Sequence, residues 1–328
     1  MPVKQVEPLK GFLVADFSRY MPGPFASGEL RRLGARVVRV EGPEGDPLRS
    51  LAPAWDASIN IGKESVTCNL KAKEGLALAN ALCARADVVF DGFRPGVLER
   101  LGVHVPERAV LCSITGFGST GPHARTAGHD VNYLGFAGVL EDTAPTLPPV
   151  QIADLCAGSL TAIAEVLGAL LVRARSGRGA RLEISMTHRS HGLVAHRLAG
   201  DPLPRLLTGG LACYRIYRTA DDRWLTVGAL ESKFFRRLCQ LIRREDLPER
   251  QYDPSAQEDL AEALAGVFRE KPLAAWLDLF EGEDVCIGPV ATIEEAVQAF
   301  GGESEARPPA LGEHTQAWRE ELGLDVGF

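Results

Sequence analysis

A histidine and a carboxylate about twenty-five residues apart are the side chains of this sequence best suited to chemistry. His129 lies in the stretch Gly128-His129-Asp130, and Asp154 opens an apolar segment with helical periodicity. Imidazole and carboxylate groups are common general acids and bases. If the two side chains faced one another across a pocket, one could remove a proton from a carbon atom and the other could return it to the opposite face.

The same residue types also have ordinary structural uses. An aspartate directly before a helix typically caps it, because its carboxylate accepts hydrogen bonds from free backbone N–H groups. We therefore expect Asp154 to be an N-cap, at a helix end whose amides and dipole could also stabilise an oxyanion. His129 alone resembles a surface histidine, Asp130 a turn former, and Glu231 a solvated residue at a helix start.

A glycine-rich stretch at residues 116–121 matches the GxGxxG pattern of dinucleotide-binding loops and follows a predicted strand. In such sites the pattern opens a helix, whose N-terminus binds the pyrophosphate. Here Pro122 and His123 follow, and helix signals are absent. We therefore predict a flexible glycine loop that shapes a pocket, and no nicotinamide or flavin site.

Composition excludes several classes of function. The 328 residues, with 45% apolar and 24% charged side chains, are typical of a globular protein of two domains. A net charge of −7 argues against a broad surface for nucleic acid or anionic membranes. We see no apolar signal core and no apolar run of membrane-spanning length, so we expect a cytoplasmic protein without a membrane partner.

Seven scattered cysteines, without a CxxC pair, predict reduced thiols. The spacing favours neither a disulfide framework nor a zinc site, and we predict no metal ligands.

Strand and helix patterns alternate over the first 185 or so residues. We predict strands at residues 12–16, 36–41, 87–90, 110–114 and 181–186, and helices at residues 24–33, 74–85 and 155–175. This alternation indicates an α/β domain with a mostly parallel sheet.

The pattern changes near residues 187–215, where periodic apolar positions become few. We assign a large domain to residues 1–187, a linker to 188–213, a small domain to 214–300, and a segment that returns to the large domain to 301–328. The small domain should be α+β. Its predicted elements are a strand pair at 214–217 and 224–228, and helices near 233–243, 257–268 and 272–280.

Motifs along nearly the whole chain resemble, in order, those of the family III (CaiB/BaiF) CoA-transferases. They are DFSRYMPGP from Asp16, LGARVVRVE from Leu33, GFRPGVLERLG from Gly92, SITGFGSTGP from Ser113 and RSGRGARLE from Arg175. Two further stretches resemble the α-methylacyl-CoA racemase branch of that family. These are AGHDVNY from Ala127 and GALESKF from Gly228.

The resemblance implies a Rossmann-like large domain with a parallel sheet, a smaller α+β domain, and a homodimer of two subunits threaded through each other as interlocked rings. The CoA moiety of an acyl-CoA substrate would lie along the large domain. The active site would form where large and small domains of different subunits meet. No cofactor beyond that CoA moiety is expected.

The resemblance also assigns roles. Asp154 matches the family's catalytic aspartate, which transferases use as a nucleophile, whereas His129 and Glu231 match racemase-type positions. In a racemase, His129 and Asp154 would move the α-proton on opposite faces, with the amides beside Asp154 receiving the enolate oxygen. Glu231 would orient His129, and Asp130 would support the pair. Proton transfer is our first hypothesis, CoA transfer the second, and a specialised paralogue with altered chemistry or a binding role the third.

The family pattern places CoA contacts at Tyr20, Met21, Pro22, Lys63, Gly92, Phe93, Arg94 and Arg100. Among these, the cations Lys63, Arg94 and Arg100 could neutralise phosphates. The chain departs from the family's basic stretch Asn-Arg-Gly-Lys-Arg-Ser, because Ile61 and Glu64 stand where the two arginines are expected. This loss of charge predicts weaker CoA binding or a different carrier, such as a carrier-protein thioester.

Overall fold

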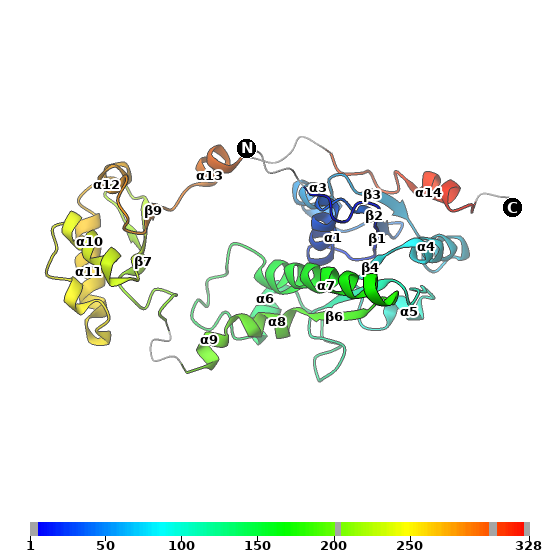
Figure 1. Cartoon of the computed structure of the whole chain (residues 1–328), viewed down its shortest axis with the longest axis horizontal. Coiled ribbons are helices and arrows are strands. Elements are labelled where there is room, and N and C mark those ends of the chain that lie inside the picture. Colours follow the sequence, from blue (N-terminus) through cyan, green and yellow to red (C-terminus); the bar gives the residue numbers. More distant parts are fainter. Residues whose placement is uncertain (1–5, 201–204, 302–306, 325–328) are drawn as a thin grey trace. The chain divides into compact units, whose positions relative to one another are not determined.

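The computed structural model describes residues 6–200, 205–301 and 307–324, and the chain divides into two compact units (Figure 1). The first unit extends to Ala195 and includes the C-terminal residues, and the second begins at His196. The first unit thus continues beyond the predicted end at residue 187, because helix α8 (Met186–Leu193) packs within it. The predicted linker at 188–213 is not a separate segment, since Leu211 and Cys213 are buried in the core of the second unit.

A six-stranded parallel sheet forms the centre of the first unit, as predicted. The strand order is β3-β2-β1-β4-β5-β6. The strands are β1 (Leu13–Asp16), β2 (Arg36–Glu41), β3 (Glu64–Thr67), β4 (Val88–Asp91), β5 (Val110–Thr115) and β6 (Arg181–Ser185). Every strand but β3 was predicted. The sequence of β3, Glu-Ser-Val-Thr, carries polar residues on both faces and lies at a sheet edge, so no apolar run marks it.

Helices cover both faces of this sheet (Figure 1). Leu30 of α1 and Val166 of α7 are buried in one apolar layer, and Leu82 of α4 and Trp318 of α14 are buried in the other. The longer helices of the unit are α1 (Pro22–Arg32), α3 (Pro53–Asn60), α4 (Lys73–Arg85), the π-helix η1 (Ala153–Leu160), α7 (Thr161–Ser176) and α8. The shorter ones are α2 (Leu48–Leu51), α5 (Val97–Arg100), α6 (Asp130–Phe136) and α14 (Thr315–Glu321). Helix α9 (Ala195–Leu198) falls at the division between the units.

The continuous helix Ala153–Ser176 is long and apolar enough to cross a membrane by length and composition. This corrects the expectation that the chain holds no such segment. Length and composition alone are weak evidence for a membrane span, because the core helix of a soluble protein meets the same criterion. Here Ala162, Val166 and Leu170 pack in the apolar layer that contains Val110 of β5 and Ile184 of β6.

The C-terminal segment completes the β3 edge of the sheet. The amide of His314 donates to the carbonyl oxygen of Ser65 at 2.9 Å. Trp318 is 1% exposed, its Nε1 donates to Glu64 Oε2 at 2.5 Å, and the Arg36 guanidinium lies 4.1 Å from its ring. Arg36 is also paired with the carboxylates of Glu64 and Glu321. This segment therefore covers what would otherwise be an open strand edge.

The second unit packs helices on one face of the antiparallel sheet β7-β8-β9. Its strands are β7 (Tyr214–Arg218), β8 (Trp224–Gly228) and β9 (Ile287–Pro289), and its helices of more than one turn are α10 (Ser232–Leu241), α11 (Gln257–Phe268), α12 (Leu273–Phe280) and α13 (Ile293–Phe300). The predicted strand pair and three helices are confirmed. Tyr217, Leu225 and Phe235 belong to its core.

We expect Trp318→Ala to destabilise the first unit by about 3–5 kcal/mol, the usual cost of deleting a buried large aromatic side chain. Hydrogen exchange followed by mass spectrometry would show faster exchange in β3 and unchanged exchange in α11. Glu64→Gln, which keeps the ring and the hydrogen bond, is the matched control. Equal exchange in β3 of the wild type and Trp318→Ala would show that the segment does not hold the sheet edge.

Candidate active site

A cavity of about 300 Å³ opens at the carboxyl ends of β1, β4 and β5. The sheet changes direction here, since β1 is followed along the chain by its neighbour β2 on one side and β4 by β5 on the other. Such a switch point is the usual ligand site of open parallel sheets. The lining comes from the loops after these strands, at residues 18–20, 92–95 and 115–118, and from residues around His129 and Asp154.

Close backbone approach between two of these loops requires glycine. A Cβ at Gly92 would lie 2.9 Å from Ser18 Cβ, and one at Gly23 would lie 1.8 Å from Ser18 Oγ. The loop after β4 is held by Asp91, whose Oδ1 accepts from the Phe93 amide at 2.8 Å. The first turn of α1 and the β4 loop therefore fit closely against the β1 loop, which fixes this side of the cavity.

The glycine stretch after β5 lines the cavity, as predicted. No helix follows it before α6, which agrees with the rejection of a dinucleotide fingerprint. Hydrogen bonds hold the loop: Thr115 Oγ1 accepts from the Gly118 amide at 3.1 Å, and Thr187 Oγ1 donates to the Gly116 carbonyl at 2.8 Å. The loop is therefore an anchored wall of the cavity.

His129 lies directly before α6 with extended backbone angles. Its amide donates to Asn132 Oδ1 at 3.0 Å, which fixes the main chain. His129 and Asn132 form a capping box, in which the histidine side chain also accepts from the Asn132 backbone amide. The His129 ring lies against the Tyr20 ring in an edge-to-face arrangement with 5.8 Å between centroids. The capping box engages one imidazole nitrogen atom, so the other remains available to a ligand.

Asp154 is not the N-cap that we expected. It lies inside the first turn of the π-helix η1, and Ile152 precedes that helix without a side-chain cap. The capping carboxylate comes from Asp130, whose Oδ1 accepts from the Asp154 amide at 2.9 Å and which also bonds the Ala153 amide. No described residue donates a hydrogen bond to the Asp154 carboxylate, which faces the cavity. Short π-helical segments often occur at functional sites.

Burial and the neighbouring charge of Asp130 raise the pKa of Asp154 to about 7. Burial also raises the pKa of Asp130, although its two amide hydrogen bonds act in the opposite direction. A carboxyl group with a pKa near neutrality can both accept and donate a proton at physiological pH. Asp130 is thus anchored by the helix amides, and Asp154 is suited to acid–base chemistry.

The expected oxyanion donors are not available. The Ala153 and Asp154 amides are taken by Asp130, and the Leu155 amide donates to the Gln151 carbonyl at 2.9 Å. An enolate oxygen therefore cannot bind these amides while the Asp130 cap is in place, which corrects that part of the sequence analysis.

Most of the predicted CoA contacts line the cavity. They are Tyr20, Pro22, Gly92, Phe93 and Arg94. Met21 does not line it, because its side chain is buried in the protein. Arg100 is exposed on α5, where its nearest described acceptor is the Pro95 carbonyl at 3.5 Å, and it is not among the lining residues.

Two cations at this edge of the sheet were missed. Arg19 lines the first cavity and an adjoining one of about 400 Å³, which Lys71 also lines. Phe93 is shared by both cavities. Arg19 lies inside a stretch that the family resemblance already marked, whereas Lys71 follows β3, the strand that the sequence did not reveal. Arg19, Lys71 and Arg94 supply positive charge for an anionic ligand.

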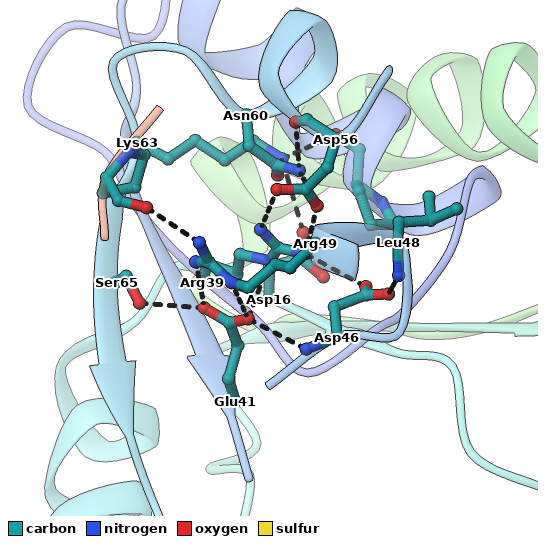
Figure 2. A network of polar contacts seen from close by, with 12 residues as sticks. Asp16, Arg39, Glu41, Asp46, Leu48, Arg49, Asp56, Asn60, Lys63 and Ser65 are labelled. Atoms are coloured by element: carbon teal, nitrogen blue, oxygen red, sulfur yellow. Dashed lines mark hydrogen bonds and ion pairs between the residues drawn. The ribbon is translucent and has the colours of Figure 1, made fainter. Parts of the chain in front are cut away.

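Lys63 cannot serve as a phosphate contact. Its side chain is 3% exposed, and Nζ donates to the Pro24 carbonyl, Ser27 Oγ and Asn60 Oδ1 at 2.6–2.8 Å (Figure 2). Asp16 Oδ2 lies 3.7 Å from Nζ. Burial lowers the pKa of Lys63 to about 8. The lysine therefore joins α1 to α3 inside the protein.

Lys63 belongs to a buried polar network (Figure 2). Its second cation is Arg39, whose guanidinium contacts three carboxylates, at 2.6 Å from Asp56, 3.1 Å from Asp46 and 3.5 Å from Glu41. Glu41 also accepts from Arg49 and from Ser65. Pairing of this kind is what permits ionised groups to be buried.

The unusual residues Ile61 and Glu64 do not line either cavity. Glu64 lies at the first residue of β3, and the cavities lie at the other ends of the strands. Its carboxylate binds Arg36 and Trp318. The departure from the family pattern at this position therefore supports the docking of α14.

Glu231 belongs to the second unit, where it is exposed and directly precedes α10. It caps no amide through its side chain. The expectation that Glu231, taken by itself, is a solvated residue at a helix start is confirmed. Its role in orienting His129 remains a prediction.

The chain matches the model of CoA-transferase family III over residues 9–315. The human alpha-methylacyl-CoA racemase is 32% identical, with 96% of this chain and 94% of that protein covered. The acetyl-CoA:oxalate CoA-transferase of Acetobacter aceti is 30% identical, with 90% and 84% covered. A crystal structure of a CaiB/BaiF family protein from Brucella suis matches with a TM-score of 0.81 at 26% identity, covering 97% of this chain and all of that one.

The family match and the fold thus define an enzyme of the α/β class, with a candidate site at the carboxyl edge of a parallel sheet. The chain belongs to CoA-transferase family III, whose members among its relatives include both racemases and CoA-transferases.

We expect Asp154→Asn to stabilise the protein at about pH 8 and to change little near pH 4. In the wild type, Asp154 keeps its proton up to about pH 7 when folded but loses it near pH 3.8 when unfolded, so stability falls as the pH rises between these values. Asparagine does not ionise, so the variant lacks this loss of stability at higher pH. Urea unfolding at several pH values measures the difference, and a difference that does not change with pH would contradict the raised pKa.

We expect Asp130→Asn to lower the pKa of Asp154, because it removes the neighbouring negative charge and leaves an oxygen that can still accept one helix amide. The ¹³C resonance of the Asp154 carboxyl carbon, followed through a pH titration, reports this pKa. An unchanged or higher midpoint would show that Asp130 does not act on Asp154 electrostatically.

Proposed function

We propose that this protein is an acyl-CoA racemase or epimerase that moves the α-proton of a 2-methylacyl-CoA thioester by two-base 1,1-proton transfer. The observation that carries the proposal is the meeting of His129 and Asp154 at one cavity, where no described residue donates a hydrogen bond to the Asp154 carboxylate and the capping box leaves one imidazole nitrogen of His129 unengaged. Relatives named as alpha-methylacyl-CoA racemases support it.

In the proposed reaction the α-carbon–hydrogen bond breaks and its electron pair moves into the thioester carbonyl, giving an enolate. The imidazole of His129 takes the proton in one direction, and the carboxyl group of Asp154 returns a proton to the opposite face. Positioned acids and bases of this kind contribute roughly 10²–10⁴-fold each. A carboxyl pKa of about 7 suits Asp154 to act in both directions.

CoA transfer is the second candidate. It is supported by relatives such as succinyl-CoA:glutarate CoA-transferase of mouse, 29% identical over 88% of this chain and 73% of that protein. The unbonded carboxylate of Asp154 could attack an acyl-CoA thioester, forming an acyl–aspartyl anhydride and releasing CoA thiolate. This chemistry needs Asp154 in its ionised form and leaves His129 without a clear role.

For either reaction the CoA phosphates would bind the cations at the sheet edge, Arg19, Lys71 and Arg94. We propose no cofactor beyond the CoA moiety of the substrate. All seven cysteines are unpaired, which supports the proposal of a cytoplasmic enzyme.

We propose a homodimer in which a partner subunit completes the cavity, as membership of CoA-transferase family III implies. Large apolar side chains support an association surface. Leu171 and Val172 of α7 are exposed, and so are Ile293 and Phe300, one above the other on α13. In the dimer a Glu231 side chain would hydrogen-bond His129 and fix its tautomer.

The decisive experiment is proton exchange of one enantiomer of a 2-methylacyl-CoA in D₂O, followed by NMR. We expect deuterium at the α-carbon together with loss of stereochemical purity. Exchange should be absent when the α-carbon is fully substituted. Binding of the ester without exchange, combined with CoA transfer to added carboxylates, would contradict the racemase and favour the transferase.

We expect His129→Ala and Asp154→Ala each to lower racemisation by about 10²–10⁴-fold, the range for loss of a positioned acid or base. Glu231→Gln should lower it less, because this residue orients the histidine without moving the proton. Circular dichroism and sedimentation would verify that the variants keep the fold and the oligomer. Near-wild-type racemisation in either alanine variant would contradict the two-base assignment.

A further inference from the structure

Tyr20 has a backbone conformation that tyrosine rarely adopts. Its φ is +61°, in the left-handed region that favours glycine, and it lies in the loop that lines the cavity after β1. The side chain is 40% exposed, so burial of the ring does not account for the conformation. Such strain persists only where surrounding interactions impose it, and it occurs preferentially at functional sites.

The interaction that holds Tyr20 comes from Asp46. The Tyr20 amide donates to Asp46 Oδ2 at 2.9 Å, and Asp46 Oδ1 accepts from the Leu48 amide at 2.9 Å. The same Oδ2 lies 3.1 Å from Arg39 Nη2. Asp46 is 3% exposed, and Figure 2 shows it within the buried network. Its carboxylate is therefore fixed on several sides before it binds the Tyr20 amide.

The consequence of this conformation is the placement of the Tyr20 ring. The ring meets the His129 imidazole edge to face, with 5.8 Å between centroids and 85° between planes. No other ring of the described chain contacts His129, whose side chain is otherwise engaged in the capping box with Asn132. The Tyr20 ring is thus the aromatic contact of the imidazole at the cavity.

We propose that Asp46 is a positioning residue, which holds Tyr20 in the left-handed conformation so that the tyrosine ring fixes the orientation of His129. The kinetic consequence rests on the proposed function of His129 as a base. Loss of the carboxylate would let the Tyr20 backbone return to a negative φ, and the ring would leave the imidazole. Misplacement of a catalytic group by about 1 Å can cost on the order of 10²-fold in rate.

The test compares Asp46→Asn with Asp56→Asn. Both substitutions remove one carboxylate from Arg39 in the same buried network, but Asp56 has no contact with Tyr20. The Tyr20 and Leu48 amides bind different oxygen atoms of Asp46, so an asparagine at position 46 would replace one of these acceptors with an NH2 donor. We expect Asp46→Asn to lower kcat for α-proton exchange about 10–100-fold, and Asp56→Asn to lower it much less at a comparable loss of stability.

A second measurement separates positioning from a general loss of structure. We expect the ¹H–¹⁵N resonances of the His129 imidazole to shift in Asp46→Asn and to remain in place in Asp56→Asn. Equal effects of the two variants on the rate and on the resonances, or no effect of Asp46→Asn, would overturn the proposal. Wild-type enzyme without any exchange activity would refute the proposed function, while the resonances would still decide whether Asp46 positions His129.

Tyr20→Gly provides a variant that leaves the buried network intact. Glycine adopts a positive φ without strain and carries no ring. We expect it to shift the His129 resonances and to reduce exchange as Asp46→Asn does, and we expect Asp46→Asn to add little in the Tyr20→Gly background. Unchanged His129 resonances in Tyr20→Gly, or fully additive effects in the double variant, would contradict the pathway from Asp46 through Tyr20.

Discussion

The hydrogen bonds that the amides at the start of η1 donate to the Asp130 carboxylate determine the geometry of the site. They tie α6 to η1, and so bring His129, the residue before α6, to the same cavity as Asp154. They also release Asp154 from the capping role that its position in the sequence predicts. Burial of Asp154, together with the neighbouring Asp130, raises the pKa of Asp154 to about 7. The Asp130 carboxylate thus has a structural role, which leaves the Asp154 carboxylate available for chemistry.

A second constraint is the buried network around Arg39 and Lys63. Its contacts connect the C-terminal segment to the loop after β1. Arg49 donates to the Pro309 carbonyl and pairs with Glu41. Asp46 pairs with Arg39 and accepts from the Tyr20 amide. Buried ion pairs contribute little net stability in many proteins, but breaking one is costly. Here the benefit is a fixed loop after β1, whose conformation a purely apolar core would not impose. The same buried network therefore fixes both the loop that lines the cavity and the docking of the C-terminal segment on the first unit.

Local patterns sufficed for most of the fold and failed where partners are distant. Apolar runs and alternating patterns revealed β1, β2, β4, β5 and β6, but β3 carries polar side chains that have partners in the C-terminal segment. The family resemblance identified the cavity through Tyr20, Phe93 and Arg94, yet Lys63, which the same resemblance assigns to CoA, is buried among oxygens of α1 and α3. Likewise, no signal near Asp154 shows that its helix is capped from residue 130. Burial and long-range pairing are properties of the tertiary structure, which local spacing does not encode.

The most direct test of two-base proton transfer is the exchange of each pure enantiomer in D₂O by the single-base variants. If His129 and Asp154 act on opposite faces, His129→Ala should exchange the α-proton of one enantiomer only, and Asp154→Ala should exchange that of the other only. Neither variant should racemise at an appreciable rate. Exchange of the same enantiomer by both variants, or of both enantiomers by either, would contradict the placement of the two bases on opposite faces of the α-carbon.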